Sequence, residues 1–234
     1  MKPKKKKLPK RLYVVRHARS LANEKLEEAQ AAGAEVFELP MPEHLAPIVE
    51  LGHEQVFDLA TWMAQLPAEE RPTRMVSSTH ERTRQTSDGL VKHGGLALEV
   101  IHDERFIEKK WGVIGGLTRQ GYHIRFPEEA ARRARQGDFR YRPAKGGESL
   151  RDVKKRVKPA LEEHLEAHAD ETLAIVTHSQ VILVLRQLIE KLSEREALEL
   201  DETRKIPNCS ICVYVRKGNR LVLEKEYFVA PKAP

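Results

Sequence analysis

Three short apolar runs in the chain have the length and residue types of buried β-strands. They are LYVV at residues 12–15, the centre of TRMVSS at residues 73–78, and LAIVT at residues 173–177. Such largely unbroken apolar character is typical of strands covered on both faces, as in a parallel sheet. A shorter strand is predicted at Val100–Ile101, and two closing strands, CSICVYV and RLVLEKEYFV, flank the turn RKGN.

Apolar residues at helical spacing fill most of the segments between these runs. A helix is predicted from His53 onward. Its apolar face consists of Val56, Leu59, Ala60, Met63 and Leu66. Residues 80–95 predict a helix closed by glycines, Ser149 and Asp152 form a capping-box variant at the start of a long helix, and VILVLRQLIEKL is an apolar helix. Strands that alternate with helices predict an α/β fold.

Two longer segments do not fit this alternation. Residues 24–50 begin like a helix and then meet one glycine and three prolines, which predicts an excursion from the core in the manner of a flap. Residues 103–147 are irregular apart from a basic helix near Pro127–Gln136. Both segments are candidates for bordering a substrate entrance.

The net charge of +6 is concentrated at the N-terminus. Residues 1–11 hold seven basic residues and no acidic one, so the rest of the chain is near neutral. A like-charged segment that contains proline predicts a disordered tail, followed by one domain over residues 12–229. Because no aromatic residues are interleaved with its lysines, we do not expect nucleic acid as a partner.

The composition favours a soluble cytoplasmic protein. Charged residues make up 32% of the chain, and no run approaches the roughly 20 apolar residues that a membrane helix requires. The basic N-terminus lacks the apolar segment of a secretory signal. We therefore expect no membrane contact, and the sequence leaves the oligomeric state open.

Cysteines and paired histidines are the other candidates for metal or redox chemistry. Cys209 and Cys212 are too few for a disulfide framework, and on a strand their side chains would face opposite ways, which predicts two ordinary buried thiols. His164 and His168 lie one helical turn apart, but they stand among glutamates, which is typical of a solvated helix face. We predict neither a metal site nor a cofactor.

Polar residues of a different kind follow three of the predicted strands. The first strand ends at Arg16 and His17, the second leads into Arg82, and LAIVT ends at His178. In parallel α/β sheets, ligands bind beyond the carboxyl ends of the strands, so these four side chains are expected at one rim. Guanidinium groups bind phosphate oxygens, and nearby arginines lower the pKa of an imidazole and keep it neutral and nucleophilic.

The motifs around these residues resemble those of the histidine phosphatase superfamily, the phosphoglycerate-mutase-like proteins. The resemblance covers roughly residues 11–229 and rests on five motifs in the same order. They are LYVVRHARSLAN, VSSTHERTRQT, IEKKWGVIGGLT, GGESLRDVKKRV and LAIVTHSQVI. The resemblance implies a three-layer α/β/α fold with a mostly parallel central sheet flanked by helices.

The resemblance also implies roles for individual residues. His17 resembles the phosphorylated nucleophile, Arg16 and Arg82 resemble the phosphate clamps, and His178 resembles the second histidine that donates to the phosphoryl oxygens. The implied chemistry needs no metal, because side-chain cations hold the charge of the transferring group.

Glu108 resembles the proton donor, and Ser20 and Asn23 resemble polar residues that line the site. A carboxylic acid can protonate a leaving alkoxide and later accept a proton from water. The chain departs from the family pattern at Ala18, where glycine is usual, and at Arg19, where an acidic or polar residue is usual. These departures affect expectations about substrate specificity rather than about the chemistry.

Taken together, the residues and the resemblance predict a metal-independent phosphatase that hydrolyses a small phosphate monoester through a phosphohistidine on His17. Two alternatives stay open at this point. One is a cofactor-dependent phosphotransferase of the phosphoglycerate mutase type, and the other is a binding protein with the same fold and no activity. The sequence does not identify the substrate.

Overall fold

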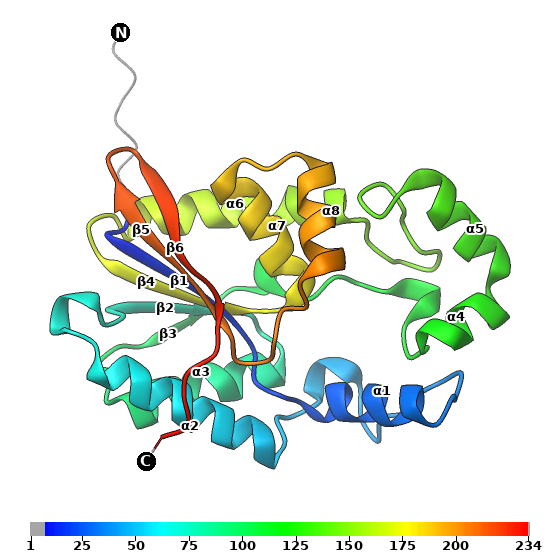
Figure 1. The fold of residues 1–234 in the computed structure, drawn as a ribbon, viewed down its shortest axis with the longest axis horizontal. Coiled ribbons are helices and arrows are strands. Elements are labelled where there is room, and N and C mark those ends of the chain that lie inside the picture. Colours follow the sequence, from blue (N-terminus) through cyan, green and yellow to red (C-terminus); the bar gives the residue numbers. More distant parts are fainter. Residues whose placement is uncertain (1–7, 234) are drawn as a thin grey trace, which may run out of the picture.

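A mixed six-stranded sheet forms the centre of the protein, whose computed structural model describes residues 8–233 (Figure 1). The strand order is β3-β2-β4-β1-β5-β6. The strands are β1 (Arg11–Arg16), β2 (Arg74–Ser77), β3 (Val100–His102), β4 (Thr172–Thr177), β5 (Ile211–Lys217) and β6 (Arg220–Phe228). The first four run parallel to one another, and β5 and β6 form the antiparallel edge.

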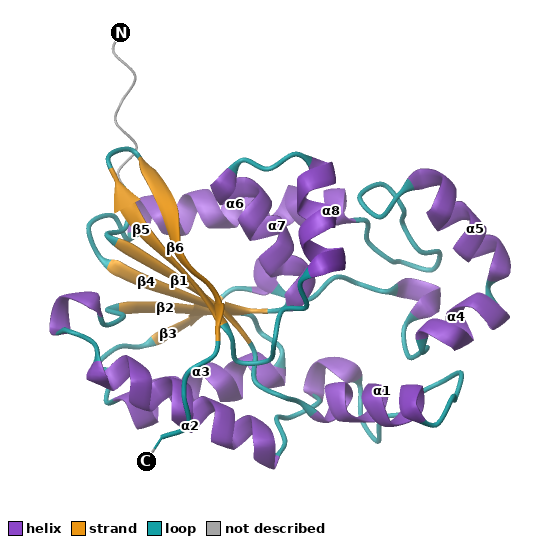
Figure 2. Ribbon diagram, in the orientation of Figure 1, coloured by secondary structure: helices purple, strands orange, loops and turns teal. Residues whose placement is uncertain are grey.

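Helices cover both faces of this sheet, which makes the predicted three layers (Figure 2). Helices α2 (Glu50–Gln65) and α3 (Glu81–Gly94) cover one face, and α6 (Leu150–Ala167), α7 (Ser179–Glu190) and α8 (Glu194–Thr203) cover the other. Successive strand residues alternate between the two cores, so that Val14 packs with α6 and α7 whereas Val15 packs with α2 and α3. The α/β class and its three-layer form are confirmed.

Most of the remaining elements stand at the carboxyl ends of the parallel strands. The lobe, residues 110–147, contains η4 (Gly112–Ile114), α4 (Arg119–Arg125) and α5 (Pro127–Gln136), and it lies well to one side of the sheet in Figure 1. Helix α1 (Leu21–Ala31) leads into the flap, residues 32–49, which holds η1 (Glu43–Leu45). Two further short turns are η2 (Ala68–Glu70) and η3 (Glu104–Phe106).

The flap joins the lobe to the body of the molecule, by which we mean the sheet and the helices that cover its two faces. Thr118 donates from its hydroxyl group to the carbonyl of Ala34 (2.7 Å), and a bridge pairs Val36 with Leu117. At Gly121 the chains approach so closely that a Cβ would lie 1.8 Å from the carbonyl oxygen of Glu35. The lobe therefore depends on the flap for part of its position.

Several predicted helix boundaries are confirmed, and others were missed. The basic helix occupies Pro127–Gln136 as predicted, and Ser149 caps α6 in a capping box with Asp152. Helix α2 begins at Glu50, three residues before the predicted start. Helices α4 and α8 were not predicted: α4 spans only seven residues, and α8 has charged residues at most of its positions.

The N-terminal prediction differs from the structure at its boundary. Residues 1–7 of the predicted tail lie outside the described residues, whereas Leu8 accepts a hydrogen bond from the backbone N–H of Asp170 and β1 already begins at Arg11. In the described part of the chain, none of the helices combines the length and apolarity needed to traverse a lipid bilayer.

The cysteine and histidine predictions need partial correction. Cys209 precedes β5 instead of lying in it, yet its side chain packs in one core and that of Cys212 in the other, so the two free thiols do lie on opposite faces. His164 is buried, with Nε2 2.9 Å from an oxygen of Asp103, so the prediction of a solvated face is wrong at this position.

Candidate active site

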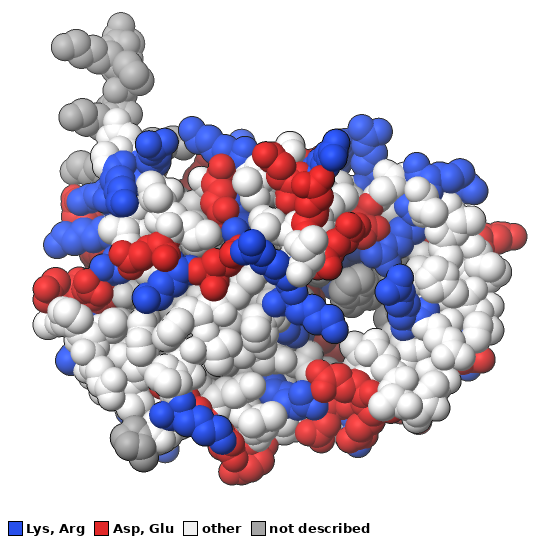
Figure 3. Space-filling view, viewed as in Figure 1, with Lys and Arg blue, Asp and Glu red and all other residues white. Residues whose placement is uncertain are grey.

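The predicted strand-end residues come together because three neighbouring parallel strands end at the same rim. His17 follows β1, His178 follows β4 beside it, and Arg82 lies in the first turn of α3 after β2. The two imidazole rings are 5.2 Å apart between centroids, and both histidines are buried. Figure 3 shows a hollow between the body and the lobe, with charged side chains of both signs around it.

The backbone around His17 fixes which ring nitrogen is free. His17 Nδ1 lies 2.8 Å from the carbonyl oxygen of Ala18, and because a carbonyl only accepts, Nδ1 carries the proton. Burial lowers the pKa of His17 well below its ordinary value, and the charges of Arg82 and Arg16 lower it further. The imidazole is therefore neutral, and Nε2 presents an unshared electron pair.

Gly52 explains how the loop after His17 is packed. A Cβ at this position of α2 would lie 2.3 Å from the carbonyl oxygen of Arg19, so only glycine lets the helix approach the loop this closely. The side chain of Arg19 forms an ion pair with Glu27 (2.7 Å).

His178 is oriented by Ser78, a residue to which the sequence analysis gave no role. Ser78 Oγ lies 2.9 Å from His178 Nε2, and the backbone N–H of His80 donates to the same oxygen (3.4 Å). This pattern favours a hydroxyl proton directed at Nε2, which leaves the proton of neutral His178 on Nδ1. Nδ1 is buried without a partner among residues 8–233, so it is available as a donor to a bound anion.

The two arginines are anchored differently. Arg16 donates through Nη1 to the carbonyl of Ile206, and its Nε is buried with no partner in the described part of the chain. Arg82 is only 3% exposed and donates through Nη1 and Nη2 to the backbone carbonyl and the side chain of Glu43. Each guanidinium retains further N–H groups beyond these contacts, because it has five donors in all.

Ser20 and Asn23 form the N-terminal capping box of α1. The backbone N–H and the hydroxyl group of Ser20 donate to Asn23 Oδ1, which also accepts from Asn208 Nδ2 (3.0 Å). Asn208 donates in addition to the carbonyl of His17 (3.2 Å). Asn208 was not predicted, although it lies shortly before β5, the closing strand that pairs with β1.

Glu108 stands beside His178 on the lobe side of the site. Its carboxyl group accepts from the backbone N–H of Lys109 (2.8 Å) and from the hydroxyl group of Ser179 (3.2 Å). Burial raises the pKa of Glu108 above its ordinary value, against the opposing effects of the Lys109 hydrogen bond and of Arg82 and Arg16. A carboxyl group whose pKa is raised in this way can stay protonated and act as a proton donor.

Glu148 is a second carboxyl group near the Glu108 loop, but its oxygens are occupied by other contacts. Both of its oxygens accept from Arg156 (2.9 Å each), and one also accepts from the backbone N–H of Lys110 (3.0 Å). Burial alone would raise the pKa of Glu148, but these hydrogen bonds hold it below its ordinary value. Arg156 also donates to the backbone carbonyls of Arg105 and Glu108, so the Glu148–Arg156 pair positions the Glu108 loop.

Two further histidines line the α3 side of the site. The ring of His80 lies edge-on to that of His178, with centroids 4.9 Å apart, and His44 of the flap lies 6.2 Å from His80. Burial and the neighbouring Arg82 lower the pKa of His80 to about 3. Neither histidine was predicted, because each is a single polar residue in an irregular segment or a loop.

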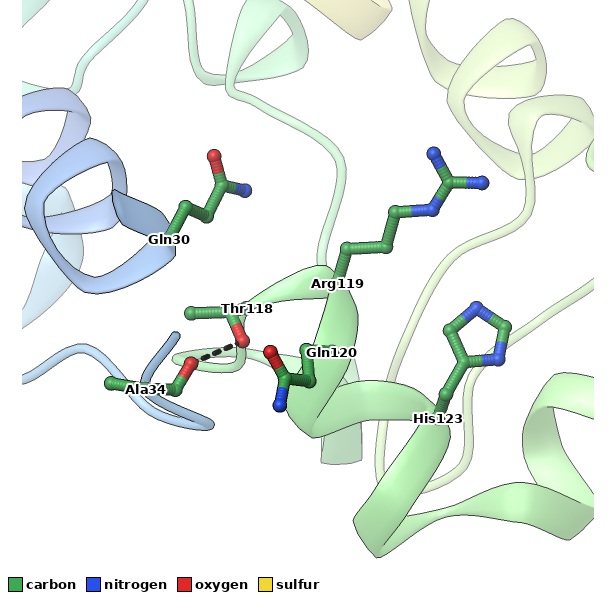
Figure 4. Close-up of a pocket in the computed structure, with 6 residues that line it drawn as sticks. All are labelled: Gln30, Ala34, Thr118, Arg119, Gln120 and His123. Atoms are coloured by element: carbon green, nitrogen blue, oxygen red, sulfur yellow. Dashed lines mark hydrogen bonds between the residues drawn. The ribbon is translucent and has the colours of Figure 1, made fainter. Parts of the chain in front are cut away.

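A separate groove lies farther along α1. It has a volume of about 330 Å³ and contains none of the predicted site residues. Figure 4 shows Gln30 projecting from α1 and Arg119 and His123 from α4, with Ala34 and Thr118 between them. Ten residues of helix place Gln30 about 15 Å from Ser20, so only an extended ligand would span both.

Comparison with known proteins identifies the family to which this fold and site belong. The model of the histidine phosphatase superfamily, branch 1, matches residues 12–227. The chain therefore belongs to the histidine phosphatase superfamily, and this membership makes it a phosphatase or phosphotransferase.

Similar curated proteins include 2,3-bisphosphoglycerate-dependent phosphoglycerate mutases. The one from Chelativorans sp. (strain BNC1) is 28% identical over 76% of this chain and 84% of that protein. The one from Sinorhizobium fredii is 30% identical over 57% of this chain and 61% of that protein.

Solved structures with the same fold include several mycobacterial proteins. "Mycobacterial hydrolase 1" has a TM-score of 0.74 and 25% identity, covering 94% of this chain and 99% of that one. A mycobacterial glucosyl-3-phosphoglycerate phosphatase in complex with VO3 has a TM-score of 0.70 and 24% identity, covering 93% and 98%. These likenesses support the phosphoglycerate mutase-like fold.

Proposed function

We propose that this protein hydrolyses small phosphate monoesters through a phosphohistidine intermediate on His17, without a metal ion. The observation that carries the proposal is the state of His17: a buried imidazole, neutral and with Nε2 free, held beside two arginines. A nucleophile needs that electron pair, and a phosphate dianion needs those cations.

In the first half of the reaction the phosphoryl group moves to the enzyme. His17 Nε2 attacks phosphorus, the bond from phosphorus to the ester oxygen breaks, and Glu108 gives its proton to the departing alkoxide. Arg16, Arg82 and the Nδ1–H of His178 hold the three non-bridging oxygens as charge develops on them. The products of this half are a free alcohol and phosphohistidine.

In the second half water replaces the histidine. Glu108, now a carboxylate, takes a proton from the attacking water, the new bond from oxygen to phosphorus forms, and the bond to Nε2 breaks. Inorganic phosphate leaves, and Glu108 is again protonated. Ser20 and Asn23 contribute by holding the α1 end of the pocket, and Asn208 joins them to the nucleophile loop.

A phosphoglycerate mutase activity is the second candidate, and the curated relatives favour it. Such an enzyme would use the same pocket but return the phosphoryl group to a second hydroxyl of the substrate. Retention of both histidines, both arginines and Glu108 in one pocket argues against an inactive binding protein.

The experiment is a panel of phosphate esters that includes an aryl phosphate, sugar phosphates, nucleotides and phosphoglycerates. Phosphate release is followed with and without a metal chelator. We expect release from at least one ester, unaffected by the chelator and lowered about a thousandfold or more by His17→Ala, with the circular dichroism spectrum unchanged.

Three results would count against the proposal. They are full activity of His17→Ala, loss of activity on chelation that one added metal restores, and interconversion of phosphoglycerates without phosphate release. The last result would establish the mutase instead.

A further inference from the structure

The flap places a carboxylate directly on the phosphate-binding arginine. Glu43 Oε1 lies 2.8 Å from Arg82 Nη2, and the backbone carbonyl of Glu43 accepts from Arg82 Nη1 (3.1 Å). Arg82 is buried, whereas the side chain of Glu43 is 48% exposed, so the carboxylate stands where the pocket opens to solvent.

Contacts on both sides of η1 hold Glu43 in this place. The backbone N–H of Ile48 donates to Gln85 Oε1 (2.8 Å), and that of Val49 donates to the carbonyl of Arg19 (3.0 Å). The other end of the flap is tied to the lobe through Ala34 and Val36. Glu43 is thus a fixed part of the pocket wall.

Glu43 and Glu108 both interact with Arg82, Glu43 through an ion pair and Glu108 through the charge of the guanidinium group. The departing oxygen receives its proton from Glu108, so the alcohol leaves between Glu108 and the pocket mouth. The negative charge of Glu43 also raises the pKa of the Glu108 carboxyl group. A charge on the leaving group would pass close to both.

The charge balance at the mouth leaves little attraction for a second anion. The scissile phosphate, as a dianion, neutralises Arg16 and Arg82, and the carboxylate of Glu43 then makes the sum negative. On the lobe side, Lys109 and Arg133 lie near two carboxylates, Asp138 and Asp201. Arg133 forms an ion pair with Asp138. The charged rim visible in Figure 3 likewise carries both signs.

We infer that Glu43 is a specificity-determining residue that selects phosphate esters of uncharged alcohols and disfavours esters that carry a carboxylate near the scissile phosphate. The inference rests on the proposed function and names its substrate class. It separates this chain from relatives whose names indicate phosphoglycerate substrates.

The experiment compares two esters that share a three-carbon skeleton. Glycerol 3-phosphate has an uncharged hydroxymethyl group where 3-phosphoglycerate has a carboxylate. The ratio of kcat/KM for the two esters is measured in the parent protein, in Glu43→Gln, and in Glu38→Gln as the matched control. Glu38 is an exposed flap residue, and its substitution makes the same change in charge.

We expect the parent to prefer glycerol 3-phosphate and Glu43→Gln to shift the ratio about five- to tenfold toward 3-phosphoglycerate, the size expected for one partly screened charge. Glu38→Gln should leave the ratio unchanged. Any equal effect of Glu43→Gln on both esters cancels in the ratio. An unchanged ratio, or a parent that prefers 3-phosphoglycerate, overturns the inference.

The same ratio can be measured without turnover. Dissociation constants of both esters are determined by calorimetry in His17→Ala, with and without Glu43→Gln. If the parent hydrolyses no ester, the proposed function fails, whereas the inference about Glu43 still stands or falls on the ratio of dissociation constants.

Discussion

The body and the lobe build opposite sides of one pocket by different means. The body supplies His17, His178 and Arg82 from beyond the ends of strands whose apolar residues are buried in two large cores. The lobe has a small core of its own around Ile114, Tyr122 and Tyr141, and it reaches the body through the flap and the Glu148–Arg156 pair.

This difference assigns different tasks to the two sides. Groups that must hold a phosphate in fixed geometry come from the rigid sheet edge, where backbone hydrogen bonds fix each position. Groups that meet the leaving group, Glu108 and Glu43, come from segments whose conformation depends on a few polar contacts. We therefore propose that the body holds the transferring phosphoryl group and that the flap and lobe select the substrate.

The largest expected effect on the lobe side concerns Glu108. Glu108→Gln keeps the shape of the side chain but cannot give a proton, so transfer from alkyl phosphates to His17 should slow about a hundredfold or more. Transfer from an activated aryl phosphate, whose oxygen leaves without help, should slow only mildly. Burst kinetics measures this first step separately from hydrolysis of the phosphohistidine.

Glu148→Gln is the matched control for that experiment. Because Glu148 acts through Arg156 on the position of the loop, its substitution should slow both ester classes to a similar and smaller extent. Equal slowing of both classes by Glu108→Gln would exclude Glu108 as the acid and move the role to Glu148 or another carboxylate. Selective slowing by Glu148→Gln would assign the role to Glu148.

On the body side, substitution of Ser78 tests whether the orientation and protonation of His178 affect the rate. Ser78→Ala removes the partner of His178 Nε2, and one neutral hydrogen bond of about 0.5–1.5 kcal/mol corresponds to a loss of roughly three- to tenfold in kcat. Ser78→Thr should restore most of the rate. Ser77→Ala is the control, because the hydroxyl group of Ser77 donates to the carbonyl of Ser78 and not to His178. An equal loss of kcat in this control would mean that the effect does not depend on the contact with His178.

The smallest expected effect is on stability at acid pH. The folded pKa of His80 is about 3, so the unfolded chain binds a proton below pH ~6.5 that the folded chain does not. Stability from this residue is therefore complete above pH ~6.5 and is lost as the pH falls, by about 1 kcal/mol at pH ~5.5. Unfolding in denaturant at the two pH values should show His80→Gln losing less stability than the parent, and an equal loss would refute the assignment.

The sequence predicted site residues best where they directly follow buried strands with a clear apolar pattern. His17 and His178 follow continuous apolar runs, and parallel pairing then dictates that the two rings meet. Ser78 lay inside a quoted motif, yet its role depends on a contact across strands with His178, 100 positions away, which local pattern does not reveal.

The contact of Glu43 with Arg82 could not be predicted from the sequence. It lies in a proline-rich segment without periodicity, and its contact with Arg82 arises from the path of the flap between anchors at residues 34–37 and 47–49. His164 was misjudged for a related reason, because the neighbouring glutamates indicated solvent while the buried partner, Asp103, comes from a distant loop.

The central claim is that His17 carries the phosphoryl group. The most direct measurement is rapid mixing with a phosphate ester, quenching in denaturant at alkaline pH, and intact-mass and peptide analysis of the trapped protein. We expect an acid-labile phosphoryl group on the peptide that contains His17, formed fast enough to account for turnover and absent from His17→Ala. Turnover with no phosphoryl group on the protein at any time, or with the group on another residue, would contradict it.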